Sequence, residues 1–270
     1  MAFHKAKKEA VYLKLAVTGP SGSGKTTGAL LMARGLVGPS GTIAVLDTEN
    51  RSASLYSDLT DFVVEDVAIP AEAKTFLTAI DEAEREHIDA LVIDSFSHVW
   101  EMVLDYKDRL DCRGGNSYTN WKEANKQWNP ILSRILQAQM HVICCLRSKT
   151  DYVIETNDKG KQAPRKVGLA PITREGTEFE FTTVFDLDMK HQATASKDRT
   201  RLFADRFVEL NEATGQQLAG WLTGPDPERV ALSNELLDIT PNPEKTRGWL
   251  AKNPSIAEIE NAITKAKEAQ

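Results

Sequence analysis

Cysteine is scarce in this sequence, with 3 residues among 270. They are Cys112 and the adjacent pair Cys144 and Cys145. This number and spacing exclude a disulfide framework and a cysteine-based zinc site. The adjacent pair lies in the apolar run HVICCL, where buried thiols behave as small hydrophobic side chains. The cysteine content therefore predicts a reducing compartment, the cytoplasm.

The sequence also lacks long apolar runs and an excess of basic residues. No apolar stretch approaches the ~20 residues of a membrane-spanning helix, and the opening MAFHKAKKEA has no apolar segment of a secretory signal. We therefore expect no membrane partner. The net charge is -6, so any nucleic-acid partner would need a local basic patch.

One glycine-rich stretch, GPSGSGKTT, organises the chain. It follows an apolar run at 11–17, precedes a helix-like run at 28–34, and matches the P-loop pattern G-x-x-x-x-G-K-[ST]. Backbone N–H groups of such a loop surround an anion, and the following helix adds its positive end. The loop predicts ATP phosphate binding by Gly19, Pro20, Ser21, Gly22, Ser23, Gly24, Lys25, Thr26 and Thr27.

Two residues of this loop have more specific predicted roles. Lys25 would place its charge near the β- and γ-phosphates, and the Thr26 hydroxyl would bind Mg²⁺. The alternative interpretation is a glycine-rich turn that contains lysine by chance.

Short apolar runs alternate with helical stretches, which is typical of βαβ units in a mostly parallel sheet. We expect strands at 12–18, 42–47, 62–66, 90–94, 141–146 and 183–187. We expect helices at 25–35, 71–86, 96–109, 120–139 and 211–222. The predicted fold class is α/β, a P-loop core with helices flanking the sheet, and ligands should gather at the carboxyl ends of its strands.

The chain divides at a proline- and glycine-rich break, Thr223 to Pro227. We predict a basic N-terminal lead at 1–10, the P-loop domain at 11–223, and a small helical region at 226–270. Prolines 241, 243 and 254 mark the expected ends of three short helices in the last region.

Carboxylates end two of the expected strands. Asp94 closes the run ALVID in the Walker B arrangement, where a carboxylate holds Mg²⁺; it could instead cap the helix that begins at Phe96. Glu49 follows the strand that ends at Asp47, a position from which a carboxylate can orient and deprotonate water. The alternative is that Asp47 and Glu49 cap a helix starting near Ser52.

The segment 147–174 is polar, turn-rich and basic. A long loop in a compact domain is usually functional or disordered. The segment could also hold a β-hairpin with Asp151–Thr156 as one arm and NDKG as the turn. Elsewhere, Trp121 and Trp128 share a helix face and are predicted core or interface anchors. His98 and His141 are predicted to be structural.

The strand-D-x-E turn after the P-loop resembles the RecA-type ATPase core. Together with LVIDSF, VICCLRSK, PITREGTEFEFTTVFDLD and SKDRT, it makes residues 11–210 similar to phage AAA-domain, RecA-like proteins, and most similar to Sak-type single-strand annealing proteins. The resemblance implies that Glu49 is the catalytic base and that Arg147 or Ser148 senses the γ-phosphate. It also implies that Lys197 and Arg199 reach a neighbour's γ-phosphate, so the chain would form a homo-oligomer, a ring or a filament.

The resemblance further implies a DNA-stimulated ATPase that acts on single-stranded DNA in phage recombination, annealing or repair, with a single-strand-binding protein as a partner. Such a protein would work in the host bacterial cytoplasm, from a phage or a prophage. The expected DNA contacts are Lys149, Lys159, Lys161, Arg165 and Lys166, with Tyr152 as a stacking surface; the alternative is a solvated loop. A DnaB-like motor or loader, a non-hydrolysing nucleotide-gated DNA-binding scaffold and a small-molecule kinase are the competing functions.

Overall fold

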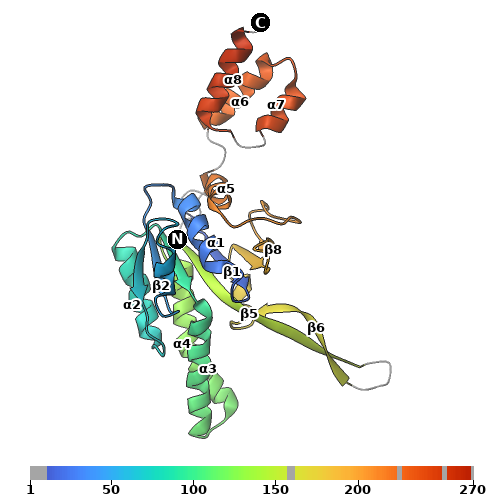
Figure 1. Cartoon of the computed structure of the whole chain (residues 1–270). Coiled ribbons are helices and arrows are strands. Elements are labelled where there is room, and N and C mark those ends of the chain that lie inside the picture. The colour runs from blue at the N-terminus through green and yellow to red at the C-terminus, as the bar shows by residue number, and fades with distance from the viewer. Residues whose placement is uncertain (1–10, 157–161, 224–226, 251–253, 269–270) are drawn as a thin grey trace, which may run out of the picture. The chain divides into compact units, whose positions relative to one another are not determined.

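A computed structural model describes residues 11–156, 162–223, 227–250 and 254–268 (Figure 1). The strands are β1 (Lys14–Gly19), β2 (Ile43–Asp47), β3 (Val63–Asp66), β4 (Ala90–Asp94), β5 (His141–Thr156), β6 (Gln162–Pro171), β7 (Thr183–Leu187) and β8 (Ala193–Asp198). The helices are α1 (Lys25–Val37), α2 (Ala73–Arg85), α3 (Phe96–Cys112), α4 (Ser117–Gln137), α5 (Glu212–Thr223), α6 (Pro227–Ile239), α7 (Pro243–Leu250) and α8 (Ile256–Glu268). Short 3₁₀ turns form η1 (Ser52–Tyr56) and η2 (Thr177–Phe179).

The strands form one mixed, mostly parallel sheet in the order β3-β2-β4-β5-β1-β7-β8, with β6 paired to β5. The antiparallel pairs among the described strands are β5 with β6 and β7 with β8. The P-loop strand β1 and the Asp94 strand β4 lie on opposite sides of β5. One strand between these two is the RecA-like P-loop arrangement, so the predicted fold class is confirmed.

Helices cover both faces of the sheet because its strands are apolar on both sides. Leu91, Ile93 and Cys144 belong to one buried cluster with α2, α3 and α4, which includes Phe76 and Trp128. Strand residues alternate between faces. The intervening buried residues therefore face the other side, where α1 packs against β1, β4 and β5. Trp128 is fully buried, which confirms its predicted place in the core.

The P-loop helix α1 is crossed by α5 at backbone contact. A Cβ added at Gly35 would lie 1.9 Å from the carbonyl oxygen of Glu212, and one at Gly215 would lie 2.2 Å from that of Met32. Each crossing position therefore requires glycine. The contact fixes the start of α5 against the helix that presents the phosphate loop.

The largest difference from the predicted elements concerns β5. We expected this strand to end at Leu146, and it continues to Thr156 and pairs with β6 as an antiparallel hairpin. The long-loop interpretation of 147–174 is therefore wrong, and the hairpin interpretation is confirmed. The hairpin extends away from the sheet (Figure 1). The predicted NDKG turn lies outside the described residues.

Contacts divide the chain into two units, Ala10–Ala219 and a second unit that includes Gly220–Gln270. The second unit contains the three predicted helices, which pack Leu236, Ile259 and Ile263 into a small core of their own. The predicted N-terminal lead lies outside the described residues. Within the parts that the structure describes, no helix is long and apolar enough to cross a membrane.

Candidate nucleotide-binding site

The ends of three strands and the middle of a fourth, β5, bring the candidate residues to one edge of the sheet. Gly19 at the end of β1 pairs in register with Arg147 on β5. Asp47 at the end of β2 pairs in register with Asp94 at the end of β4. Because these strands run parallel, their carboxyl ends meet, as expected for a ligand site in an open α/β sheet.

The P-loop itself is a tight turn closed by its own backbone. Gly22 and Gly24 have φ of 81° and 89°, which glycine adopts without strain. Ser23 N–H donates to the Pro20 carbonyl at 3.2 Å, and Lys25 Nζ donates to the same oxygen at 2.9 Å. The loop leads directly into the N-terminus of α1, where the helix dipole favours an anion.

Thr26 and Asp94 meet behind this loop. The Thr26 hydroxyl donates to Asp94 Oδ2 at 2.6 Å, and the carboxyl is 2% exposed. Burial raises the pKa of Asp94 to about 6, although the Thr26 hydrogen bond opposes that shift. A buried carboxylate of this kind is stabilised by a nearby cation.

The turn after β2 presents Glu49 to the same space. Asp47 accepts hydrogen bonds from Glu49 N–H at 2.6 Å and Ala53 N–H at 2.8 Å. Asp47 therefore holds the start of η1, as the capping interpretation expected for that residue. The Glu49 side chain lines the cleft described below, so the cap leaves its carboxylate facing the P-loop.

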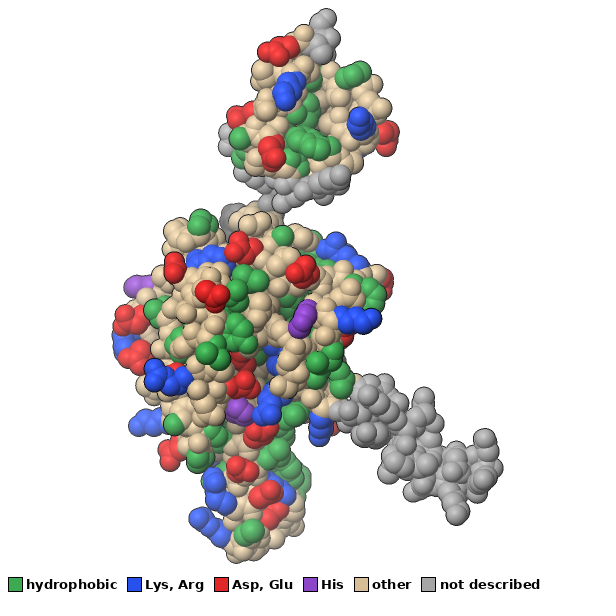
Figure 2. Space-filling model, viewed as in Figure 1, with side chains coloured by type: hydrophobic (Ala, Val, Ile, Leu, Met, Phe, Trp, Pro, Cys, Tyr) green, Lys and Arg blue, Asp and Glu red, His purple; other side chains and the backbone are tan. Residues whose placement is uncertain are grey.

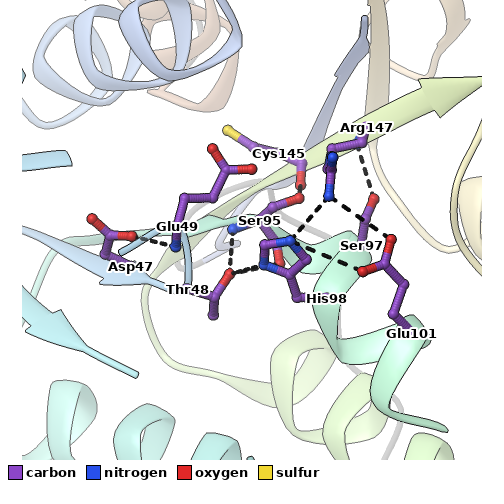
Figure 3. A network of polar contacts seen from close by, with 9 residues as sticks. All are labelled: Asp47, Thr48, Glu49, Ser95, Ser97, His98, Glu101, Cys145 and Arg147. Carbon is purple, nitrogen blue, oxygen red and sulfur yellow. Dashed lines mark hydrogen bonds and ion pairs between the residues drawn. The ribbon is translucent and has the colours of Figure 1, made fainter. Parts of the chain in front are cut away.

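Arg147 reaches the site from β5 and is held there by His98. Figure 3 shows the His98 ring between Thr48 and Arg147, with Glu101 beside it. Arg147 Nη1 lies 3.1 Å from His98 Nε2 and 3.9 Å from Glu101 Oε1. His98 Nδ1 lies 2.7 Å from Thr48 Oγ1. This network connects the turn after β2 to Arg147 in β5.

These residues surround a polar cleft of about 600 Å³. Its lining combines loop backbone, two cations, two carboxylates and hydroxyl groups: Ser21, Gly22, Gly24, Lys25, Thr26, Thr27, Glu49, Asn50, Ser52, Tyr56, Asp94, His98, Arg147 and His191. Gly19, Pro20 and Ser23 are absent from that lining and form the turn behind it.

On the face seen in Figure 2, acidic and basic side chains are interspersed over this unit instead of separated by sign.

The residues of the cleft fit a nucleotide with Mg²⁺. Ser23 Oγ is fully buried and has no hydrogen-bond partner among the described residues. Thr26 and Asp94 provide the oxygen ligands that Mg²⁺ prefers, and few protein ligands are needed when phosphates supply the rest. Bound there, the ion would neutralise charge that develops on the phosphates. No cluster of three His, Cys, Asp or Glu side chains forms a separate metal site in the described part of the chain.

The predicted finger residues lie outside the cleft of their own chain. Lys197 lies near the end of β8 and Arg199 directly follows the strand. Both donate to the carbonyl oxygen of Phe179, Arg199 at 3.1 Å. Of the predicted DNA contacts, Lys149 is exposed on β5. Arg165 and Lys166 lie on β6, in register with Val153 and Tyr152. Lys159 and Lys161 fall outside the described residues.

Two histidines of the cleft were missed by the sequence analysis. His98 was predicted to be structural, and the structure places it in the lining of the cleft, one turn into the helix that leaves Asp94. His191, in the β7–β8 turn, lies 3.0 Å through Nδ1 from the Ser23 carbonyl. Neither has a local sequence signal, because their partners come from other strands. His141, by contrast, accepts a hydrogen bond from Leu13 N–H at the opposite edge of the sheet.

The sheet order, the P-loop and the strand-end carboxylates define a P-loop nucleotide-binding protein of the ATPase class. The chain belongs to the AAA domain family AAA_24, whose sequence profile matches residues 12–219. Among curated proteins, none matches this sequence. Among solved structures, it is similar to the KaiC-like protein PH0186 from the hyperthermophilic archaeon Pyrococcus horikoshii OT3. The identity is 17%, covering 73% of this chain and 82% of that one, with a TM-score of 0.42.

Proposed function

We propose that this protein is an oligomeric ATPase that acts on single-stranded DNA in phage recombination, annealing or repair, related to Sak-type annealing proteins. The observation that carries the proposal is that one strand, β5, borders the nucleotide cleft at Arg147 and continues into the β5–β6 hairpin. The site that would hold ATP and the element that bears the predicted DNA contacts are therefore one continuous backbone.

In the proposed reaction, Lys25 and the loop N–H groups bind the phosphates, and Thr26 and Asp94 hold Mg²⁺. Glu49 orients the attacking water and accepts its proton. Arg147 contacts the γ-phosphate from the opposite wall. Most of the rate acceleration comes from positioning and charge stabilisation by these groups.

Lys197 and Arg199 complete the site from a neighbouring copy in this proposal. β8 is one edge strand of the described sheet, and Arg199, which follows it, is exposed. Both side chains would exchange their contacts with the Phe179 carbonyl for the phosphate of a neighbouring copy. Arg199→Ala should lose turnover and keep nucleotide binding, and mixing it with Glu49→Gln should restore some activity. No restoration at any mixing ratio would count against a site shared between subunits.

Measurement of ATP turnover with and without single-stranded DNA tests the main proposal. Stimulation by DNA that disappears in Glu49→Gln, while ATP binding is retained, would support it. Absence of turnover with retained DNA binding would favour a nucleotide-gated scaffold, and unwinding of a forked duplex would favour a DnaB-like motor or loader. Phosphate transfer to a small-molecule acceptor would refute all three.

The hairpin is tested separately through its charges. Reversal of Lys161, Arg165 and Lys166 should weaken binding of an oligothymidylate and reduce its salt dependence, because each lost phosphate contact lowers the slope by roughly 0.7 for a single strand. An unchanged affinity and slope would exclude the hairpin from the DNA site. A single-strand-binding protein partner and a location in the bacterial cytoplasm are further parts of the proposal.

A further inference from the structure

The N-terminus of α3 contacts two strands that are not neighbours in the sheet, one at its carboxyl end and the other near its middle. In the sheet, β4 lies between β2 and β5, so the helix that leaves β4 begins between the end of β2 and the part of β5 near Arg147. On the β2 side, Ser95 N–H donates to Thr48 Oγ1 at 2.8 Å. On the β5 side, Arg147 N–H donates to Ser97 Oγ at 2.9 Å. The start of α3 therefore connects the Glu49 turn to the strand that becomes the hairpin.

The hydrogen-bond partners of His98 determine where its proton lies. A guanidinium has donors and no acceptor, so His98 Nε2 must accept from Arg147 Nη1 across 3.1 Å. The neutral ring then carries its proton on Nδ1 and donates it to Thr48 Oγ1 across 2.7 Å. The hydroxyl accepts a second hydrogen bond from Ser95 N–H and donates its own proton to the Ser95 carbonyl at 3.2 Å. Both ring nitrogens of His98 and the Thr48 hydroxyl thus have hydrogen-bond partners, and Glu101 Oε2 lies 4.0 Å from His98 Nε2.

Arg147 belongs to two parts of the molecule, the cleft through its side chain and the base of the hairpin through its backbone. Its side chain is 44% exposed and lines the cleft together with Lys25. Its backbone stands at the root of the hairpin: its carbonyl accepts from Ile172 N–H at 2.6 Å, and the next residue, Ser148, pairs with Pro171. The residue whose guanidinium lines the cleft is therefore also the residue at which both hairpin strands leave the sheet.

We propose that His98 is a positioning residue that fixes Arg147 relative to the Glu49 turn and couples nucleotide in the cleft to the root of the β5–β6 hairpin. The inference rests on the proposed function, because it takes ATP as the ligand of the cleft. His98 acts through Arg147 and Thr48 and touches no reacting atom itself.

Two substitutions separate the two contacts of the ring. His98→Asn places an amide N–H where Nδ1 was, so it keeps the donor to Thr48 and loses the acceptor for Arg147. His98→Gln places its carbonyl oxygen near the position of Nε2, so it keeps the acceptor and loses the Thr48 donor. The matched control is His87→Asn, an exposed histidine with φ of 55° in the turn after α2, a conformation that asparagine tolerates.

The experiment measures kcat and KM for ATP, together with amide hydrogen exchange over 147–149 and 169–173 with and without adenosine 5′-thiotriphosphate. Wild type and His87→Asn should show an exchange change at the hairpin root when the analogue binds. In His98→Asn, kcat should fall by at least about tenfold, the lower end of the range for one lost hydrogen bond to a charged group. KM should change little and the exchange response should disappear. His98→Gln should stay within about threefold of wild type and keep the response.

The inference fails if His98→Asn and His98→Gln both behave as wild type. It also fails if both lose activity equally along with a lowered melting temperature, since that describes a structural role. If wild type binds the analogue without turnover, the exchange response alone decides, because it does not depend on hydrolysis. If wild type binds no adenine nucleotide, the proposed function and this inference are both refuted.

Discussion

Substitution of Asp47 distinguishes its structural role in the turn after β2 from the catalytic role proposed for Glu49. This carboxylate is 1% exposed and accepts two backbone hydrogen bonds, from Glu49 N–H and Ala53 N–H. In Asp47→Asn, one carboxylate oxygen becomes an NH₂ group, which meets a backbone donor and cannot accept from it. The variant therefore loses one charge-assisted hydrogen bond and loosens the turn that presents Glu49.

The expected cost follows from that single contact. A hydrogen bond to a charged group contributes about 1.5–3 kcal/mol. For a unit of about 200 residues, 1 kcal/mol corresponds to a shift of roughly 2–4 °C in Tm. Asp47→Asn should therefore lower Tm by roughly 3–12 °C and reduce kcat for ATP, while ATP affinity stays close to that of wild type because the P-loop is untouched.

Glu49→Gln is the matched comparison, because it removes the proposed base and leaves the Asp47 contacts in place. It should abolish turnover with Tm unchanged. Thermal unfolding and steady-state turnover of both variants make the assay. Full turnover in Asp47→Asn with a lowered Tm would show that the cap does not position Glu49. An unchanged Tm would show that the hydrogen bond lost in this variant contributes no stability.

Three further predictions concern single residues. The pKa of Asp94 is raised from 3.8 to about 6 by burial, so its contribution to stability is complete below pH 3.8 and is lost as the pH rises through 6. Asp94→Asn should unfold like wild type near pH 4, be more stable by about 2–3 kcal/mol at pH 7.5 without nucleotide, and lose Mg²⁺-dependent turnover; equal stability at both pH values would contradict this. Burial lowers the pKa of His141 to about 4, so its contribution is complete above pH 6.5 and is lost as the pH falls to 4. Urea unfolding should show a loss of about 3 kcal/mol over that range, which His141→Asn should abolish. Gly35→Ala should cost 1–3 kcal/mol or more by separating α1 from α5, whereas Gly220→Ala, with open space around the added methyl, should cost nothing; equal unfolding of the two would refute the close crossing.

The sequence alone was sufficient to predict features that depend on residues close together in the chain. The P-loop, the helix after it and the strand-end carboxylates Asp94 and Glu49 are local patterns, and the sheet order then brings them together because parallel strands share one edge. The three C-terminal helices were likewise marked by prolines and the break at 223–227. The catalytic, metal-binding and DNA-binding roles of these residues stay predictions.

The sequence was insufficient where partners come from distant segments. His98 carries no ligand-spaced neighbour, and it enters the cleft only because β4 separates β2 from β5. The length of β5 was missed because its second half is polar, and a polar segment becomes a strand when β6 supplies its hydrogen bonds. The glycine requirement at Gly35 depends on Gly215, 180 positions later, which no local pattern indicates.

The continuous strand β5 also has a mechanical consequence. From Arg147 to Thr156 it spans 10 residues, or about 30 Å at roughly 3.3 Å per residue. At that length, a rotation of about 5° at Arg147 would carry the far end through roughly 3 Å. A displacement small enough to leave the packed core intact at the cleft would thus become a movement of a few ångströms at the far end of the strand.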